Sequence, residues 1–404
     1  MPAVVLLGTL DTKGAEYGFL RDRLNEHGVD ALLIDAGIVG EPKVQPNVTK
    51  EEVAQAAGAN VRRLAEAGDR GAAVEAMGRG AAEVVERLHT EGRLDAIAGL
   101  GGSGGTSLIS HAMQALPVGV PKLIVSTVAS GDTRPYVGAS DVTMMYSVVD
   151  IAGINQISAR IIANAAGAIA GMAKASVPKL GEAKPLVGAS MFGVTTPAVD
   201  MARKRLEELG YEVLVFHQTG TGGESMEALV GSGFISAVLD VTTTELCDEL
   251  VGGVFPAHPK RLEAAGEVGI PQVVSLGALD MVNFGPKESV PEKFKDRNLY
   301  VHNPTITLMR TTPDECAELG RRIARKLNDA TGPTTLFVPL QGVSLIATEG
   351  QTFHDPEADE ALFAALRENL ESNVELIELD AHINDPEFAI AMAEKLHEHY
   401  GEGY

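Results

Sequence analysis

The sequence is poor in cysteine and in basic residues. Among 404 residues there are two cysteines, Cys247 and Cys316, too few for a disulfide framework or a paired metal motif. Lysine and arginine number 33 against 55 aspartates and glutamates, giving a formal net charge of −22. Because so acidic a surface repels nucleic acid and anionic membranes, neither is expected as the main partner. Any phosphate binding must then come from backbone N–H groups and a few chosen cations.

Long apolar segments and several catalytic motifs are also missing. The longest apolar helical pattern, Ile151–Ala175, contains Asn155, Arg160 and Asn164, which excludes a membrane-spanning helix. The N-terminal segment lacks the basic region that opens a signal peptide, so a cytoplasmic location is predicted. The ten histidines show no H-x-H or H-E-x-x-H spacing, and no G-x-S-x-G elbow occurs. These absences disfavour a histidine metal site and a serine hydrolase.

What the chain does contain is an alternation of short β-rich runs with longer helical patterns. This alternation is typical of α/β proteins, in which crossover helices flank a parallel sheet. The pattern restarts after Ser176–Lys184, which reads as a linker. We therefore predict two Rossmann-like lobes with mostly parallel sheets and flanking helices, at residues 1–178 and 185–404. The segment Gly277–Asn303 lacks clear periodicity and is predicted to be a long loop of the kind that often carries function.

The most informative segment is a glycine-rich turn between a predicted strand and a predicted helix. Residues 99–106 read Gly-Leu-Gly-Gly-Ser-Gly-Gly-Thr. Bare N–H groups at a helix start, with the positive end of the helix dipole, form a cradle for phosphate. Because each glycine loses much backbone freedom on folding, five of them favour a ligand over the alternative, a tight packing turn. The residues expected to bind are Gly101, Gly102, Ser103, Gly104, Gly105 and Thr106.

The glycine turn does not match the best-known nucleotide motifs. No Gly-Lys-Ser/Thr follows it, as a Walker A motif requires. No acidic residue lies about twenty positions further on, where a dinucleotide site would place its ribose acceptor. The turn by itself therefore predicts phosphate or another anion, and not NAD.

A second set of polar residues follows the first predicted strand. Thr9, Asp11, Thr12 and Lys13 occupy its turn, and Asp35 ends the second predicted strand. Because the carboxyl ends of parallel strands face the ligand crevice, we expect these side chains at the binding site. Lys13 would neutralise phosphate, Asp11 could hold Mg²⁺ and Asp35 could bind ribose hydroxyls. The competing interpretations are a helix cap at Asp11 or Thr12, a solvated Lys13 and turn initiation by Asp35.

Other polar segments are further candidates for ligand contacts. The loop after the fourth predicted strand offers small and hydroxyl-bearing residues at Thr127, Ala129, Ser130 and Gly131. In the second half of the chain, substrate contacts are predicted at His302, Asn303 and Arg310. The segment Gln218–Gly223 is another glycine- and threonine-rich turn after a strand. These residues could form a second site that faces the first across a cleft between the lobes, and ordinary polar loops are the alternative.

Several of these segments together resemble a widespread, largely uncharacterised bacterial family. That family shares its fold with the N-terminal ATP-binding region of the tomato mosaic virus resistance protein. The resemblance covers nearly the whole chain. It is carried by Asp11–Lys13 and residues 99–107, 121–131 and 147–155 in the first lobe, and by residues 280–285 and 302–311 in the second.

The resemblance implies ATP binding in the first lobe and a homodimer, but no settled reaction. Our first hypothesis is a nucleotide-binding protein that takes ATP and Mg²⁺ in the first lobe and a second substrate in the cleft. One alternative is an ATP-dependent kinase or ligase acting on a small carboxylate or sugar acid, with His302 and Arg310 as substrate clamps. Another is a nucleotide-responsive sensor or interaction module. Release of ADP or AMP would distinguish the enzyme from the other two.

Overall fold

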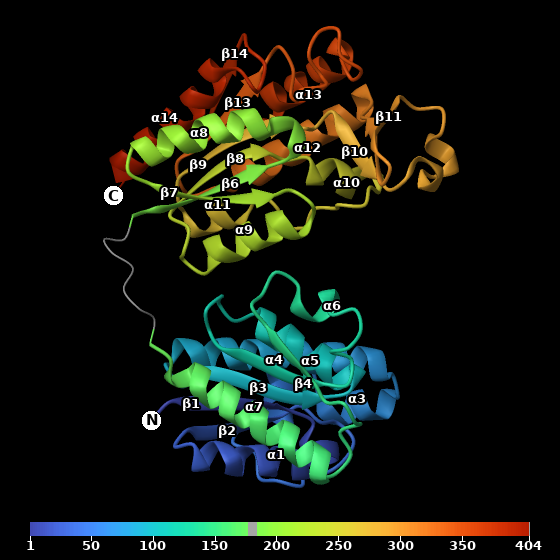
Figure 1. Cartoon of the computed structure of the whole chain (residues 1–404), viewed down its shortest axis with the longest axis vertical. Coiled ribbons are helices and arrows are strands. Elements are labelled where there is room, and N and C mark those ends of the chain that lie inside the picture. Colours follow the sequence, from blue (N-terminus) through green and yellow to red (C-terminus); the bar gives the residue numbers. More distant parts are fainter. Residues whose placement is uncertain (177–183, 404) are drawn as a thin grey trace. The chain divides into compact units, whose positions relative to one another are not determined.

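The computed structural model describes residues 1–176 and 184–403 and divides into two compact units (Figure 1). We call Met1–Lys179 the first lobe and Leu180–Tyr404 the second lobe. The predicted linker Ser176–Lys184 lies outside the described residues except at its two ends. No helix in the described part of the chain is both long and apolar enough to cross a membrane.

The first lobe is built on a parallel sheet of five strands. Their order is β2-β1-β3-β4-β5. The strand order therefore reverses between β1 and β3, because β2 is added on one side of β1 and β3 to β5 are added on the other. The two central strands β1 and β3 consist entirely of apolar and small residues, as strands covered on both faces require. They are β1 (Ala3–Gly8), β2 (Asp30–Asp35), β3 (Ala96–Gly101), β4 (Lys122–Ser126) and β5 (Thr143–Tyr146).

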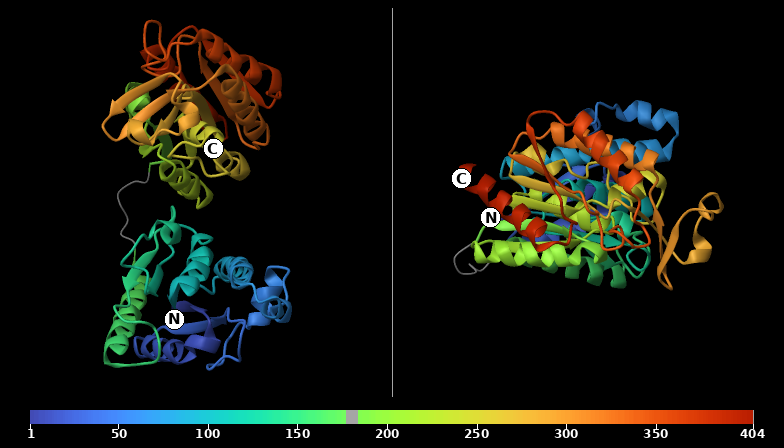
Figure 2. Two further views of the ribbon diagram at one scale, coloured as in Figure 1. Left: turned by 90° about the vertical axis from the view of Figure 1, so that its right-hand side faces the viewer. Right: turned by 90° about the horizontal axis from the view of Figure 1, so that it is seen from above.

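Helices cover both faces of this sheet because successive residues of each strand point to opposite sides. Val4 and Leu6 pack with α1 and α7, whereas Val5 and Leu7 pack with α2, α3, α4 and α5. The two helical layers are visible in Figures 1 and 2. The helices are α1 (Leu10–Glu26), α2 (Lys50–Ala56), α3 (Val61–Ala67), α4 (Arg70–Thr90), α5 (Ser103–Gln114), α6 (Arg134–Val137) and α7 (Gln156–Lys174).

The second lobe repeats this architecture with a parallel sheet of six strands. Their order is β14-β13-β9-β8-β6-β7, and the direction of travel reverses between β6 and β8. The strands are β6 (Leu186–Met191), β7 (Glu212–His217), β8 (Ala237–Thr242), β9 (Gln272–Gly277), β13 (Thr334–Pro339) and β14 (Val374–Leu379).

The helices of the second lobe also form two layers. Val187 and Val273 pack with α8 and α14, whereas Val274 and Leu276 pack with α10, α12 and α13. Met226 of α9 and Ala265 of α11 pack with β8. The helices are η1 (Gly193–Thr195), α8 (Thr196–Glu208), α9 (Thr221–Gly231), α10 (Glu245–Val251), α11 (Ala264–Val268), α12 (Pro313–Asn328), α13 (Pro356–Asn369) and α14 (Pro386–Gly403).

A small antiparallel sheet interrupts the second lobe between β9 and α12. It consists of β10 (Met281–Phe284), β12 (Ile306–Arg310) and β11 (Leu299–Asn303), in that order, with the short helices η2 (Lys287–Ser289) and η3 (Glu292–Phe294) between β10 and β11. The prediction of one long loop at Gly277–Asn303 is therefore wrong, because these strands are too short to show a period. The prediction of two Rossmann-like lobes is confirmed.

Candidate functional site

The first lobe contains a cavity of about 810 Å³ at the carboxyl ends of β1 and β3. This is the point at which the strand order reverses, where open parallel sheets commonly bind ligands. The turn after β1 contributes Thr9, Asp11, Thr12 and Lys13, and the turn after β3 contributes the backbone of residues 101–105. The structure thus brings two predicted segments that are about ninety residues apart onto one cavity, because β1 and β3 are neighbours in the sheet.

The glycines of the second turn fall into two groups. A methyl group on Gly99 would lie 2.7 Å from the Ile109 side chain, and one on Gly101 would lie 2.8 Å from the backbone of Gly105. These two glycines are required by close packing. Methyl groups on Gly102, Gly104 and Gly105 would lie no closer than 3.4 Å to any other group, and none of the three has a positive φ. Packing therefore accounts for part of the glycine content and leaves three cavity-lining glycines unexplained.

The N-terminus of α5 opens onto the same cavity. Gly102 is its N-cap residue, and no side chain caps this end of the helix. The first N–H groups of a helix have no partner within the helix, so here they are available to a ligand. The positive end of the helix dipole adds to their attraction for an anion. The Thr106 hydroxyl, in contrast, is buried and is hydrogen-bonded to Ser126, with 2.7 Å between the two oxygens.

Asp11 links the turn after β1 to the loop after β2 at the cavity. One carboxylate oxygen accepts hydrogen bonds from the Val39 and Gly40 N–H groups at 3.1 and 3.2 Å, and the other accepts from Thr12 N–H at 2.7 Å. Lys13 lies in the lining, and its ammonium group donates to the Ile151 carbonyl. Both oxygens of Asp11 thus accept hydrogen bonds from the backbone, and the metal-binding role of this residue stays a prediction.

Asp35 lies beneath the cavity and is not part of its lining. Its side chain is buried, and one oxygen accepts hydrogen bonds from Leu10 N–H at 3.0 Å and Gly37 N–H at 2.9 Å. Burial raises the pKa of this carboxyl group, and the two hydrogen bonds oppose that rise. The structure gives Asp35 a role in joining the turns after β1 and β2, so a ribose could reach it only if that packing opened.

The loop after β4 contributes less than the sequence suggests. Thr127 lies beside the glycine turn, where its N–H donates to the Gly101 carbonyl at 3.2 Å. Ala129, Ser130 and Gly131 do not line the cavity, and Ser130 and Gly131 are exposed. Of this predicted segment, only Thr127 is in contact with the turn.

Sequence reasoning missed the third wall of the cavity, which α3 and α4 provide. Leu64, Val74 and Met77 form an apolar surface there, and Arg70 begins α4. A methyl group on Gly104 would lie 3.4 Å from an Arg70 guanidinium nitrogen. Within the described residues, this guanidinium makes no hydrogen bond or ion pair. A cation in the first turn of a helix opposes the helix dipole, and this unfavourable placement is the one signal that sequence reasoning could have used.

In the second lobe, the three predicted substrate residues do not lie together. His302 and Asn303 line a small pocket of about 250 Å³. Arg310 is 4% exposed and forms an ion pair with Asp359 at 2.6 Å, and it donates to the Phe353 carbonyl at 2.8 Å. This arginine is thus a buried link between β12 and α13, and it is absent from the pocket lining.

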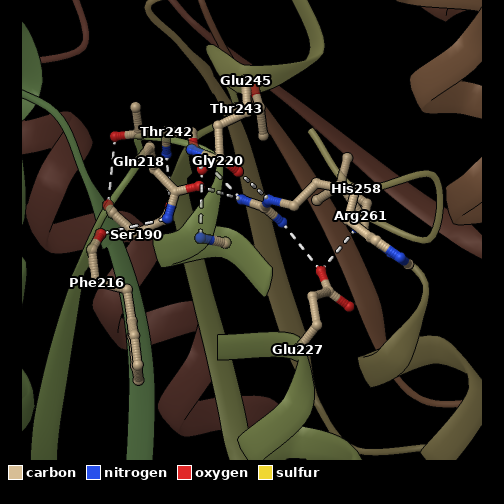
Figure 3. Close-up of polar contacts among 12 residues, drawn as sticks. Ser190, Phe216, Gln218, Gly220, Glu227, Thr242, Thr243, Glu245, His258 and Arg261 are labelled. Atoms are coloured by element: carbon tan, nitrogen blue, oxygen red, sulfur yellow. Dashed lines mark hydrogen bonds and ion pairs between the residues drawn. The ribbon is translucent and has the colours of Figure 1, made fainter. Parts of the chain in front are cut away.

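The glycine-rich turn Gln218–Gly223 is occupied by the chain itself. It runs into the first turn of α9, and the Gly220 and Gly223 N–H groups donate to one carboxylate oxygen of Glu245 at 2.6 and 3.3 Å. The other oxygen of Glu245 accepts from Arg261 at 3.1 Å. Figure 3 shows this arrangement around the turn. An internal carboxylate thus fills the position that an anionic ligand would take.

Arg261 is fully buried and binds two more carboxylates besides that of Glu245. It donates to Asp240 at 2.7 Å. It also donates to Glu227 at 3.2 Å (Figure 3). Burial raises the pKa values of Glu227 and Glu245, and the Arg261 charge opposes that rise. Nothing in the sequence near Gln218–Gly223 indicates this cluster, because Glu245 and Arg261 come from later segments.

Comparison with known proteins places both lobes in one family. The N-terminal and C-terminal domain models of the Uncharacterised protein family (UPF0261) match residues 2–178 and 184–400. A UPF0261 protein of Clostridium tetani is 57% identical over 394 residues, which cover 97% of this chain and 98% of that protein.

A plant protein also matches over much of the chain. The ToMV resistance protein Tm-1(GCR237) of Solanum lycopersicum is 46% identical over 332 residues, or 80% of this chain and 44% of that protein. Among solved structures, MurG of Acinetobacter baumannii is 13% identical, and 99% of this chain aligns with 95% of that chain at a TM-score of 0.22. So low a score supports no inference about function.

Proposed function

This chain belongs to the Uncharacterised protein family (UPF0261), and we propose that its first lobe binds a nucleotide, ATP, in the cavity at the carboxyl ends of β1 and β3. One observation carries the proposal. Gly102, Gly104 and Gly105 are not required by packing or by backbone conformation, and all three line this cavity at the uncapped start of α5. Glycine at such positions lets a phosphate approach the backbone N–H groups.

The two kinds of surface in the cavity match the two parts of a nucleotide. The glycine turn and the Thr9 and Thr12 hydroxyls make one side polar, whereas Leu64, Val74 and Met77 make the other side apolar. An adenine ring would bind the apolar side while the phosphates bind the amides. The volume of about 810 Å³ lies within the range of roughly 300–1,000 Å³ found for small-molecule sites.

Two cations support the binding of phosphate despite the net negative charge of the chain. Arg70 lies next to Gly104 and has no partner among the described residues. Lys13 has three donors, of which one is used by the Ile151 carbonyl. A planar guanidinium can bind two phosphate oxygens at once, so we assign the larger share of the charge neutralisation to Arg70.

The proposal includes Mg²⁺ as a companion of the nucleotide. The described residues contain no group of three His, Cys, Asp or Glu side chains that could hold a metal by themselves. Mg²⁺ commonly takes its ligands from phosphate oxygens, water and one or two carboxylates. Asp150 lines the cavity and is exposed, and only one of its oxygens accepts a hydrogen bond from a described residue, Ile151 N–H at 2.8 Å, so it suits that role better than Asp11, both of whose oxygens accept.

Isothermal titration calorimetry with ATP and Mg²⁺ tests the proposal. The wild-type chain is expected to bind, and Gly104→Val is expected to weaken binding about tenfold or more, because the side chain blocks the phosphate from the α5 amides. The control is Gly171→Val, at an exposed helical glycine of α7 where a methyl group meets nothing within 4 Å.

Two outcomes would overturn the proposal. One is the absence of ATP binding by the wild-type chain, and the other is an unchanged Kd in a folded Gly104→Val variant. The same samples assayed for ADP or AMP release separate an ATP-dependent kinase or ligase from a binding protein. Sedimentation analysis of the wild-type chain tests the homodimer that the family resemblance implies.

A further inference from the structure

A second, smaller pocket lies in the second lobe near the carboxyl ends of β6 and β7. Gly193 and Val194 of η1 come from the turn after β6, His217 ends β7, and Ile306 and Leu308 come from β12 of the antiparallel sheet. The pocket lies at the carboxyl edge of the main sheet, the edge at which open parallel sheets commonly bind ligands, on the β7 side of the reversal between β6 and β8. The antiparallel sheet thus forms a wall of the pocket at a position that favours ligand binding.

The polar side chains of the pocket can donate hydrogen bonds, and none of the described residues that line it is an aspartate or glutamate. The side-chain oxygen of Asn303 already accepts from Thr305 at 2.8 and 2.9 Å, which leaves its NH₂ group to donate. The His217 and His302 rings make no hydrogen bond to another described residue. In a chain with 55 acidic residues, a pocket lined by donors and free of carboxylates favours an anion over a cation.

The other side chains that line the pocket are aromatic or aliphatic, and they favour a ligand with a flat, apolar part. The rings of Phe192 and His217 lie with their centroids 5.4 Å apart and their planes tilted by 32°, and Phe255 adds a further ring. The volume of about 250 Å³ is below the range of roughly 300–1,000 Å³ for drug-sized ligands. We propose that this pocket binds a small planar carboxylate, with its ring between the aromatic and aliphatic side chains and its carboxylate hydrogen-bonded to His217, His302 and Asn303.

Gly193 supports the proposal in the same way as the glycines of the first lobe. A methyl group at this position would meet nothing within 4 Å, and its φ is not positive. The fold therefore accepts a side chain there. A larger residue at position 193 would instead extend into the pocket and compete with a ligand.

The test uses benzoate as the probe and the full chain without nucleotide, so its result is independent of ATP binding. Saturation-transfer NMR is expected to show binding of benzoate but not of benzylamine, which has the same ring and the opposite charge. Gly193→Leu is expected to weaken benzoate binding about tenfold or more while the circular dichroism spectrum stays unchanged. The matched control is Gly231→Leu, at an exposed glycine of α9 that also meets open space.

A second variant checks the polar part of the site. His302→Ala removes an exposed ring and is expected to fold, and benzoate binding should weaken because one donor is lost. The proposal is overturned if benzoate does not bind, if benzylamine binds as well as benzoate, or if Gly193→Leu and wild type bind benzoate equally. An unchanged benzoate Kd in His302→Ala would reject the assigned hydrogen bonds.

Discussion

Two glycine-rich turns in this chain look alike in sequence and differ in the structure. In the first lobe, Gly101–Gly105 leads into α5, and no side chain caps the helix. In the second lobe, Gly220–Gly223 leads into α9, and the carboxylate of Glu245 accepts hydrogen bonds from two of its N–H groups. An arginine accompanies each turn, but Arg261 is buried among carboxylates whereas Arg70 is exposed with no partner among the described residues.

The difference shows that a glycine-rich turn at a strand end indicates an anion-binding position. The turn does not show whether a carboxylate of the chain or a bound ligand occupies that position. A backbone N–H group needs an acceptor, which the chain, a ligand or water can supply. In the second lobe the chain supplies it. In the first lobe a cavity of about 810 Å³ lies over the turn, and this contrast supports the nucleotide proposal.

Removing the Glu245 carboxylate tests the difference between the two turns most directly. Glu245→Ala would leave three donors without acceptors, on Gly220, Gly223 and Arg261, and lower the free energy of unfolding by about 3–5 kcal/mol. Acetate should then bind in the vacated position, and at about 100 times its Kd it would restore about 2.7 kcal/mol. Urea unfolding with and without acetate measures both effects.

The control for this experiment is Glu249→Ala on the same helix. Glu249 is exposed and pairs with Arg322 at the surface, so its loss should change stability by less than about 1 kcal/mol, and acetate should have no effect. Equal responses of the two variants to acetate would show that the turn before α9 is not an anion site.

Stability measured over a pH series also distinguishes the two lobes, because the buried carboxylates of the second lobe titrate and the backbone amides of the first turn do not. Burial raises the pKa of Asp280 in the second lobe to about 6, and the Arg310 charge opposes that rise. A raised pKa means that the folded state keeps its proton while the unfolded state has lost it. Stability from this group is therefore full below about pH 4 and declines as the pH rises to about 6, by about 3 kcal/mol.

The matched variant for the pH series is Asp280→Asn. It cannot ionise, and the Asn oxygen can still accept from the Ser344 hydroxyl, which lies 2.8 Å from the carboxylate in the wild type. Urea midpoints from pH 4.5 to 7.5 should decline less steeply in the variant. Parallel pH profiles for the two proteins would contradict the prediction.

The smallest expected changes in stability distinguish the glycines of the first turn that packing requires from those that it does not. Gly101→Ala places a methyl group 2.8 Å from the Gly105 backbone and should lower stability by about 1–3 kcal/mol. Gly105→Ala meets nothing closer than 3.9 Å, and alanine favours a helix, so stability should be unchanged or rise by up to about 1 kcal/mol. Thermal unfolding measures both changes, and equal losses of stability would remove the distinction on which the proposed site depends.

Much of the first-lobe cavity could be anticipated from sequence, because neighbouring parallel strands bring their turns to one edge. Thr9, Thr12, Lys13 and the glycine turn meet there for that reason. Arg70 was missed, because it reaches the cavity through the packing of α4 beside α5, and its place in the first turn of a helix was the one local signal. The bond from Gly37 to Asp35 is the turn-initiating role given above as the alternative for Asp35, whereas the bonds of Asp11 to Val39 and Gly40 could not be anticipated because they depend on loop geometry.

The α/β class and the two glycine-rich turns were determined by the sequence alone. Both follow from local patterns, namely the alternation of strand and helix and the glycines that end a strand. Only the tertiary structure decided which turn stays open. Glu245 lies 25 residues from Gly220, and Arg261 comes later still, so the acceptor that closes the second turn is recruited through non-local contacts. The partners of buried polar groups often lie far apart in the sequence, so a short segment of sequence does not show which groups will pair.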